Sequence, residues 1–444
     1  MKPPQPAPSW QQILEEKQSE FNKALGRADF HEAVRKSWGE RYPYWDELKY
    51  WPTPAGLSPE LVWSYRELTA VTARKYLPLQ DVAGKVFSFW LPDSAQECLH
   101  YIDKHAAGPV LSDGRLIHSK ERYIARSLTD EAIASSQIEG AATTREAARR
   151  LLQSGRLPVD KSERMIVNNY RAIERIRELK DASLTTEAVL ELHAILTAGT
   201  LPDEAAGRLR QSPQDDDIVV EDADGAILHR PPKGETLPGR LEAFLTFANA
   251  EQEASFIHPV IKAIILHFWI GYDHPFIDGN GRTARAVFYW HLLRRDYWLF
   301  EYISISQIVK RTDAQYRRAY LHSEAPGGDL TYFIMYNLRV IRLAIKEQLQ
   351  YIERKSAELE RAGLTLRRLP DLNHRQRELL VHALKNPGHR YTIKTHQSLH
   401  QTAYQTARTD LIALQKKGFL EAVKDGRLLV YLPTARVAEA LKTF

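Results

Sequence analysis

The stretch from about Arg122 to Ile352 has the sequence pattern of one helix after another, with long amphipathic segments among them. Its most apolar segment is Pro259–Ile270, which carries large side chains over one broad face. Pro259 suits the first turn of a helix, where the missing N–H is not needed. A helix of this kind must be covered by others, so we expect a mainly α protein with Pro259–Ile270 at its centre.

Further elements follow from local signals. An Asp224-Gly225 pair between Ile218–Val220 and Ala226–Leu228 predicts a short β-hairpin. Thr129 is a candidate N-cap for a helix that ends before Gly140. The remaining helices are expected at Ser58–Lys75, Ser94–His105, Thr129–Ile138, Thr144–Gln153, Lys161–Lys180, Thr186–Ala198 and Arg282–Leu293.

The two ends of the chain differ from its middle. Residues 1–115 form an aromatic- and proline-rich helical region without a catalytic pattern, and residues 353–369 are a charged linker helix. Residues 370–444 follow the order of a winged helix-turn-helix, a small α+β domain. Its expected elements are helices at Gln376–Leu384, Thr395–His400 and Ala403–Lys417, and strands at Tyr391–Ile393, Phe419–Val423 and Leu428–Tyr431, the last two joined at Asp425-Gly426.

Composition narrows the class of protein. The 444 residues are 43% hydrophobic and 26% charged, which is typical of globular domains. The longest apolar stretch, Ala263–Ile270, is far shorter than the ~20 residues that span a bilayer. The N-terminus lacks a secretory signal and Cys98 has no disulfide partner, so we expect a cytoplasmic protein without membrane contact. A net charge of +5 permits contact with nucleic acid without demanding it.

One loop carries a concentrated set of chemical groups, His274-Pro-Phe-Ile-Asp-Gly-Asn-Gly-Arg-Thr-Ala-Arg285. Gly279 and Gly281 flank Asn280, so the backbone can form a concave nest of N–H groups at the start of the next helix. That helix start favours an anion. Arg282 and Arg285 are three residues apart on the same helix face, where both can bind phosphate oxygens.

The same loop offers two further groups. Asp278 provides the hard oxygen ligand that suits Mg²⁺, an ion that enters proteins with phosphates. His274 lies just outside the anion site and is expected to titrate near neutral pH, as a general base should. Together these residues predict polyphosphate binding beside a base.

Three other interpretations of this loop fit the sequence less well. Gly279–Ala284 matches the G-x-G-x-x-A dinucleotide fingerprint, but a helix and a proline loop precede it instead of a strand. A metal site at His258, His267 and His274 would lack a recognised ligand spacing. If this were an ordinary polar loop, the grouping of the two glycines, Asp278 and the paired arginines would be a coincidence. A Walker phosphate loop is absent from the sequence.

His274–Arg285 resembles the signature of the Fic (Fido) family, HPFx[D/E]GNGRxxR, at every defined position. The resemblance extends over about Arg122–Asn337. It implies a Fic-type helical core, here residues 116–352, that transfers AMP from ATP onto a protein hydroxyl. The hairpin Ile218–Leu228 resembles the family's flap, which aligns a target segment by strand addition, although an ordinary surface hairpin has the same pattern.

The resemblance assigns roles by position. His274 resembles the base that deprotonates the target hydroxyl, and Asp278 the Mg²⁺ ligand. Phe276 resembles the core anchor of the loop. Residues expected to bind ATP are Gly279, Asn280 and Gly281 at the phosphates, Arg282 and Arg285 at the β- and γ-phosphates, and Tyr316 near the adenine, where core packing is the alternative. Phosphate-donating relatives of the Doc type carry Lys at the position of Gly281, so this glycine favours adenylyl transfer.

An upstream segment, Ser135-Ser-Gln-Ile-Glu139-Gly140, matches the family's autoinhibitory motif [S/T]xxxE[G/N]. A carboxylate of Glu139 paired with Arg285 would deny that guanidinium to the γ-phosphate. A solvated carboxylate at a helix end is the alternative. Related enzymes also use this glutamate to remove AMP, and that activity stays open for this chain.

The sequence therefore predicts an autoinhibited protein adenylyltransferase that modifies a Ser, Thr or Tyr hydroxyl of a target protein or of itself. The alternative is a DNA-binding regulator whose Fic-like core senses nucleotide, although His274 would then have no purpose. UTP or another donor is not excluded. For the C-terminal domain, Gln405, Arg408 and neighbouring polar residues suit DNA bases, but Lys and Arg are sparse, so a homodimer or protein partner is an equal candidate.

Overall fold

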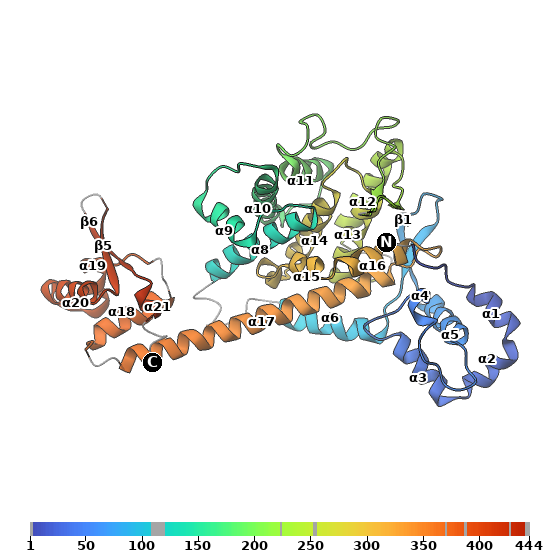
Figure 1. The fold of residues 1–444 in the computed structure, drawn as a ribbon, viewed down its shortest axis with the longest axis horizontal. Helices are drawn as coiled ribbons and strands as arrows, with labels where there is room; N and C mark the ends of the chain where they lie inside the picture. The colour runs from blue at the N-terminus through green and yellow to red at the C-terminus, as the bar shows by residue number, and fades with distance from the viewer. Residues whose placement is uncertain are drawn as a thin grey trace. The chain divides into compact units, whose positions relative to one another are not determined.

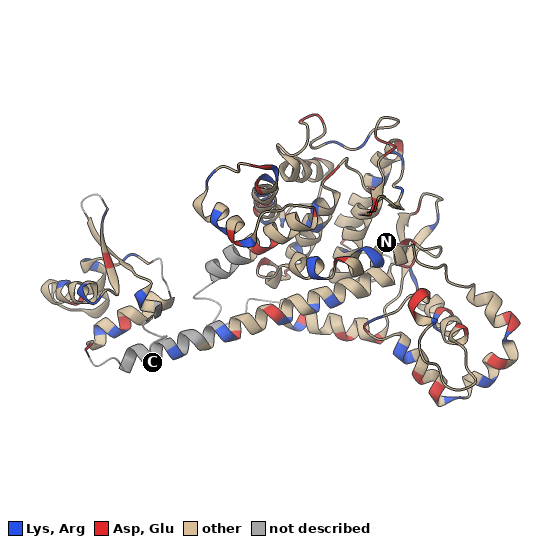
Figure 2. Ribbon diagram, in the orientation of Figure 1, with Lys and Arg blue, Asp and Glu red and all other residues tan. Residues whose placement is uncertain are grey.

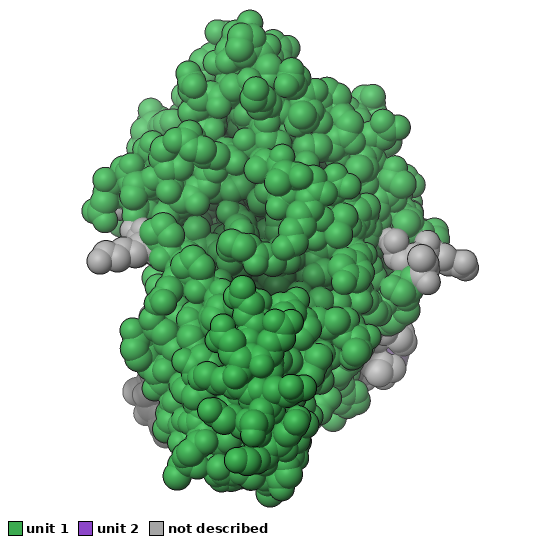
Figure 3. All heavy atoms as spheres, turned by 90° about the vertical axis from the view of Figure 1, so that its right-hand side faces the viewer, with its two compact units in different colours: residues 1–110, 124–346 green, residues 111–123, 347–444 purple. Residues whose placement is uncertain are grey.

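The computed structural model describes residues 3–107, 120–222, 224–251, 255–368, 371–385, 389–425 and 428–439. The described chain is mostly helical with a few short strands (Figure 1), as expected from the sequence. It divides into unit 1 (residues 1–110 and 124–346) and unit 2 (residues 111–123 and 347–444). Figure 3 shows one face of unit 1 with all its heavy atoms.

The centre of unit 1 is a pair of packed helices, α13 (Pro259–Asp273) and α14 (Asn280–Arg294). Three helices surround the pair: α10 (Lys161–Leu179), α11 (Thr186–Thr197) and α12 (Leu237–Asn249). All residues of α13 from 260 to 270 are buried, as predicted for the most apolar segment. Each large apolar side chain removed from water stabilises the folded state by about 1.5–3 kcal/mol. The many buried side chains of α13 and α14 therefore hold the two helices, and the turn that joins them, firmly in place.

Caps define where several helices begin. The side chain of Thr144 accepts a backbone N–H of α9 (Arg145–Ser154), Thr185 does the same for α11, and Ser304 for α15 (Ile305–Arg311). Each cap satisfies a donor that the first helical turn leaves free. The predicted cap at Thr129 is wrong, because α8 (Lys120–Ile138) begins nine residues earlier and Thr129 lies inside it.

The last two helices of unit 1 along the chain are α16 (Asp313–Glu324) and the first part of the long α17 (Thr331–Arg368). The expected linker 353–369 is the continuation of α17 as far as Arg368; residue 369 lies outside the described residues. The helix α6 (Asp93–Ala106) runs along the first part of α17, where the thiol of Cys98 donates to the Leu338 carbonyl at 3.3 Å (Figure 1). Both basic and acidic residues occur along α17 (Figure 2), whose first half also carries buried residues such as Phe333 and Ile341.

The N-terminal region packs on the same unit through a buried charged cluster. Arg66, fully buried, donates to the Tyr332 hydroxyl at 2.7 Å, and Arg74 pairs with Glu67 at 2.8 Å and Asp329 at 3.3 Å. The cluster joins this region to the start of α17. The N-terminal elements are α1 (Trp10–Glu16), α2 (Gln18–Leu25), α3 (Ala28–Ser37), α4 (Trp45–Leu48), α5 (Pro59–Ala73), β1 (Lys75–Gln80) and β2 (Val86–Phe89).

The predicted hairpin is present and shorter than expected, with β3 (Val220–Glu221) antiparallel to β4 (Ile227–His229). The strands begin two residues and one residue later than the sequence indicated. His229 ties β4 to the core, because its ring lies 2.7 Å from the Tyr272 carbonyl and 2.9 Å from a Glu324 oxygen. Short 3₁₀ turns at Gly234–Thr236 and Trp298–Glu301 complete the unit.

Unit 2 has its own small core around Leu380, Leu411 and Tyr431. Three helices and a two-stranded sheet follow the predicted order; Tyr391 forms only a bridge to Tyr431, because Ile393 already starts a helix. Gly426 and Arg427, at the predicted turn, lie outside the described residues. The elements are α18 (His374–Lys385), α19 (Ile393–His400), α20 (Tyr404–Lys416), β5 (Leu420–Asp425), β6 (Leu428–Pro433) and α21 (Arg436–Glu439).

None of the helices in the described part of the chain combines the length and the apolar composition that crossing a membrane requires.

Candidate active site

The connection between α13 and α14, residues 274–279, is a turn with two left-handed residues. His274 has φ 45° and caps α13 by donating its N–H to the Ile270 carbonyl at 3.0 Å. Gly279 has φ 86° directly before α14, and a Cβ there would lie 2.8 Å from Thr197. A non-glycine residue in this conformation is strained, and such strain persists only where surrounding structure enforces it.

Arg210, which lies outside the turn, holds the backbone of His274 in its left-handed conformation. The guanidinium is buried, and its Nε donates to the His274 carbonyl at 2.7 Å while Nη2 donates to the Pro232 carbonyl at 2.7 Å. The Arg210 N–H donates to the Pro275 carbonyl at 2.9 Å. These bonds hold the imidazole of His274 in place through its main chain.

His193 supports the other half of the turn. Its ring stacks on Phe276 with centroids 3.8 Å apart, and its Nε2 lies 2.8 Å from the Asp278 carbonyl. The Gly207 N–H donates to Nδ1 at 2.9 Å, so Nδ1 is unprotonated and the proton resides on Nε2. Burial lowers the pKa of His193 to about 4, which keeps this neutral form at physiological pH.

Asn280 locks the turn from within. Its side-chain oxygen accepts the Phe276 N–H at 2.9 Å and its amide donates to the Phe276 carbonyl at 2.7 Å. The side chain is therefore occupied, and what Asn280 offers an anion is its backbone N–H in the first turn of α14. N–H groups of a first helical turn have no intrahelical acceptor.

Two buried arginines lie on α14 as predicted. Arg282 donates from Nη1 to the Leu196 carbonyl at 2.8 Å, and its Nε has no hydrogen-bond partner among the described residues. Arg285 donates from Nε to the Ser135 hydroxyl at 2.9 Å and from Nη2 to the Ser135 carbonyl at 3.1 Å. A buried guanidinium with free donors is a site for an anion.

Glu139 lies against this positive end of α14. Its Oε1 accepts from Nη2 of Arg285 at 2.8 Å, and a Cβ built on Gly281 would collide with the same oxygen. The structure thus brings Ser135, Glu139 and Arg285 together, as expected from the motif. Gly140 follows with φ 93°, a conformation that frees the chain to turn after the helix.

The protonation of His274 differs from the sequence expectation. Burial lowers its pKa to about 4, and the neighbouring His229 ring adds to the shift. Burial alone would also lower the pKa of His229, but the hydrogen bond and charge of Glu324 outweigh it and raise that pKa. His274 is therefore a neutral imidazole throughout the physiological range, which is the form that accepts a proton.

Tyr316 is buried in an aromatic cluster on α16. Its hydroxyl lies 2.8 Å from Nε2 of His267, and its ring packs against Tyr320 and Phe333. This placement favours the packing role, and contact with adenine stays a prediction.

Asp278 presents a half-exposed carboxylate at the mouth of the site. It accepts the Gly279 N–H at 2.5 Å and lies 3.6 Å from Arg282. The described residues hold no cluster of three His, Cys, Asp or Glu that could cage a metal. A single carboxylate suits Mg²⁺, which retains waters and shares its coordination with substrate phosphates.

Sequence reasoning did not identify His193 or Arg210. Both are distant in sequence from the turn they hold, and both act on main-chain carbonyls. Their buried polar side chains within otherwise apolar or loop segments were the available signal.

Comparison with known proteins finds relatives of the part of the chain that contains this turn. Residues 183–292 match the model of the Fic/DOC family. "Protein adenylyltransferase Fic" of Nematostella vectensis is 30% identical over 160 residues, covering 36% of this chain and 33% of the relative. The protein of the same name from Drosophila grimshawi is 31% identical over 166 residues, covering 36% and 32%. The chain thus spans about a third of the length of these curated relatives.

The fold has a counterpart among solved structures. A Fic family protein from Desulfovibrio desulfuricans G20 is similar with a TM-score of 0.51, at 19% identity, over 76% of this chain and 95% of that chain. This likeness concerns the fold. The aligned Fic/DOC region contains the whole turn and α14 as far as residue 292, and it excludes Glu139.

The tautomer of His193 gives a testable prediction. His193→Gln retains a donor toward the Asp278 carbonyl, whereas His193→Asn retains only the acceptor for the Gly207 N–H. We expect the Gln variant to bind ATP with nearly unchanged affinity and the Asn variant to bind about tenfold more weakly, because only the Asn variant loses the buried hydrogen bond to the turn that carries Asp278 and Gly279. Calorimetric titration of the full chain measures this, with thermal unfolding as the folding control. Equal affinities of the two variants would contradict the assignment.

Proposed function

We propose that this protein is an autoinhibited protein adenylyltransferase, which transfers AMP from ATP to a Ser, Thr or Tyr hydroxyl of a target protein or of itself. The observation that carries the proposal is the arrangement at one turn: a neutral imidazole at residue 274, a helix start with two buried arginines at 282 and 285, and a carboxylate closing that start. The names of the relatives support the same activity.

His274 is proposed as the general base. A hydroxyl is a weak nucleophile at neutral pH without an adjacent base. The imidazole accepts the hydroxyl proton as the oxygen attacks the α-phosphorus, and the bond to the β-phosphate oxygen breaks to release pyrophosphate. Arg210 contributes by holding the His274 main chain, so the ring meets the target in one orientation.

The first turn of α14 is proposed to bind the phosphates. Backbone N–H groups at Gly279, Asn280 and Gly281, with the guanidinium groups of Arg282 and Arg285, stabilise the negative charge that develops as the bond breaks. Gly281 leaves room for a phosphate oxygen close to the backbone, because any Cβ would fill that space.

Asp278 is proposed to hold Mg²⁺ together with the nucleotide's phosphates. The ion would supply charge neutralisation at the phosphate oxygens. The Asp278 main chain, held by His193, keeps this carboxylate at the mouth of the site.

Glu139 is proposed as the inhibitor. Its pair with Arg285 places a negative charge where a γ-phosphate would bind, so ATP is repelled or bound with its α-phosphate displaced from the base. Ser135 steadies the same guanidinium from the helix side.

The hairpin β3–β4 is proposed to align the target segment, since His229 anchors β4 beside the base.

Residues 370–444 are proposed to form a winged helix-turn-helix. Leu399, Tyr404 and Leu428 are exposed there, which favours a protein partner or a second copy over DNA, whose binding needs many Lys and Arg. A cytoplasmic location is part of the same proposal.

Glu139→Gly should raise AMP transfer about 100-fold, because one donor at a charge-stabilising site is worth about that factor. The full chain is incubated with Mg²⁺ and labelled ATP, GTP or UTP, and intact mass reports the addition of one nucleoside monophosphate. The matched variant Glu139→Gly/His274→Ala should show no transfer. Unchanged activity of Glu139→Gly would refute inhibition, and transfer by the double variant would refute the role of His274.

The pKa of His274 predicts the pH dependence of transfer. The base must be unprotonated, and its pKa of about 4 keeps it so from pH 8 down to about pH 5. In Glu139→Gly, kcat/KM should therefore stay level over that range and decline below it. The profile of kcat/KM reports the free enzyme. An acid limb near the ordinary histidine value of about 6.5 would contradict the buried, neutral imidazole.

A further inference from the structure

Helix α8 meets α14 through residues spaced by four on both helices. On α8 these are Glu131 and Ser135, with Glu139 just past its end; on α14 they are Arg285 and Tyr289. Residues four apart share one helix face. The Ser135 and Glu139 oxygens accept from Arg285 at 2.9 and 2.8 Å, and an oxygen of Glu131 accepts from the Tyr289 hydroxyl at 2.9 Å. The contacts therefore form an antiparallel ladder.

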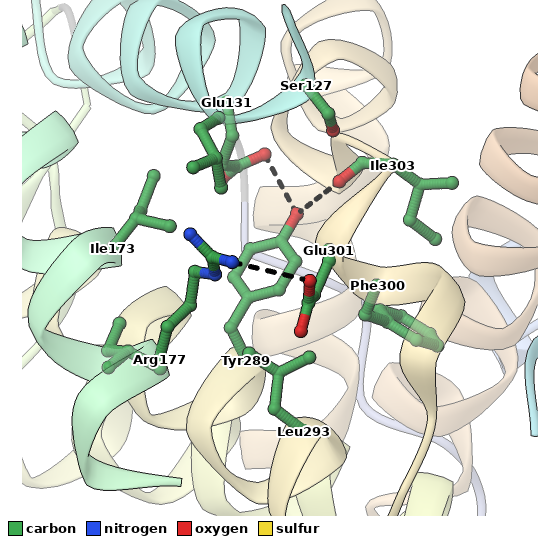
Figure 4. A pocket seen from close by; sticks show the side chains of 11 residues that line it. Ser127, Glu131, Ile173, Arg177, Tyr289, Leu293, Phe300, Glu301 and Ile303 are labelled. Carbon is green, nitrogen blue, oxygen red and sulfur yellow. Dashed lines mark hydrogen bonds and ion pairs between the residues drawn. The ribbon is translucent and has the colours of Figure 1, made fainter. Parts of the chain in front are cut away.

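Glu131 is the most heavily bonded member of this ladder. Besides Tyr289, its carboxylate accepts from the Ser304 hydroxyl at 2.7 Å and from both the N–H and the hydroxyl of Ser306, at 3.1 and 2.5 Å. Figure 4 shows Glu131 directed at the Tyr289 hydroxyl, which also donates to the Ile303 carbonyl at 3.4 Å. The carboxylate thus joins α8 to α14 and to the start of α15.

The surroundings of Glu131 are closed. A cavity of about 10 Å³ next to it holds at most one water, and the pair between Arg177 and Glu301, 3.6 Å apart, lines the same space (Figure 4). Glu131 is 4% exposed. At the other end of the ladder, the Glu139 side chain is 25% exposed and makes a single hydrogen bond among the described residues.

We propose that Glu131 is a positioning residue: it fixes the register of α8 on α14 and thereby places Glu139 over Gly281 and Arg285. This inference rests on the proposed function of Glu139. The strong end of the ladder is remote from the nucleotide, so it stays bound whether or not a phosphate occupies the site. The weak end is free to exchange its carboxylate for a phosphate.

Glu131 makes no hydrogen bond to the groups proposed to act on ATP or on the target hydroxyl, but its charge acts on one of them, Arg285. Tyr289→Phe leaves that charge in place and removes only a contact between the two helices. The effect of Tyr289→Phe should therefore appear only while Glu139 is present. A side chain that merely supported the fold would affect transfer equally in both backgrounds.

The test compares Glu131→Gln and Tyr289→Phe with the wild-type full chain, each also in the Glu139→Gly background. Tyr297→Phe is the matched control, because its hydroxyl donates to a carboxylate, Asp103, at 2.6 Å without touching α8. Three quantities are measured: AMP transfer from labelled ATP with Mg²⁺, ATP affinity by calorimetry, and hydrogen exchange of residues 127–141 without nucleotide.

We expect Glu131→Gln and Tyr289→Phe to raise AMP transfer and ATP affinity at least severalfold and to accelerate exchange of residues 127–141. Neither variant should raise transfer further in Glu139→Gly, and Tyr297→Phe should change nothing. The inference would be overturned if the two variants accelerated hydrogen exchange but kept wild-type AMP transfer and wild-type ATP affinity. It would also be overturned if they changed AMP transfer equally in the wild-type and the Glu139→Gly backgrounds.

A failure of the proposed function is distinguishable. If Glu139→Gly transfers no nucleotide, that function fails, and the calorimetry decides the inference by itself. ATP affinity must then rise in Glu131→Gln as it does in Glu139→Gly, and an unchanged affinity refutes the positioning role. Tyr289→Phe, which removes one oxygen atom, decides the outcome if Glu131→Gln does not fold.

Discussion

The turn between α13 and α14 is the constraint on which the candidate site depends. Two apolar helices pack at the centre of unit 1, and their connection must reverse direction within residues 274–279. That reversal requires left-handed backbone at His274 and Gly279, which costs free energy that neighbouring groups must offset. Arg210 and His193 do so by binding carbonyls of the turn. The same reversal exposes the start of α14 and places an imidazole beside it, so one piece of geometry brings together the proposed anion site and the proposed base.

Burial of positive charge explains why a carboxylate lies against the start of α14. An unpaired guanidinium in a dry interior is costly, and removing one member of such a pair is strongly destabilising. Arg285 is 2% exposed, and Glu139 is the one carboxylate hydrogen-bonded to it among the described residues, so the guanidinium is stabilised by a negative group beside it. Glu139 supplies that group in the present structure, and a phosphate of ATP would supply it in the active state. We propose that Glu139 and a phosphate of ATP are alternative partners of this one positive charge, and that the contacts between α8 and α14 determine how readily Glu139 gives way.

Most residues of the candidate site could be predicted from the local sequence. The residues of the turn and of the first turn of α14 are contiguous, so His274, Asp278, Gly279–Arg282 and Arg285 were recognisable together. The pairing of Glu139 with Arg285 was inferred from a motif. His193, Arg210 and Glu131 escaped prediction, because each acts across many residues on a carbonyl, a hydroxyl or a helix start that leaves no local pattern. The start of α8 at Lys120 was missed for a related reason: Thr129 resembles a cap, but tertiary packing continues the helix through it.

The central claim is that Glu139 and the γ-phosphate compete for Arg285, and the affinities for ATP and AMP test it most directly. Calorimetry on the wild-type chain and on Glu139→Gly, with Mg²⁺ present, measures both. AMP lacks the γ-phosphate, so its affinity should be the same in both proteins. The affinity for ATP should rise about tenfold or more in Glu139→Gly, because the freed guanidinium gains a charge-assisted hydrogen bond worth about 1.5–3 kcal/mol. Equal changes in the two affinities, or none in that for ATP, would contradict the account.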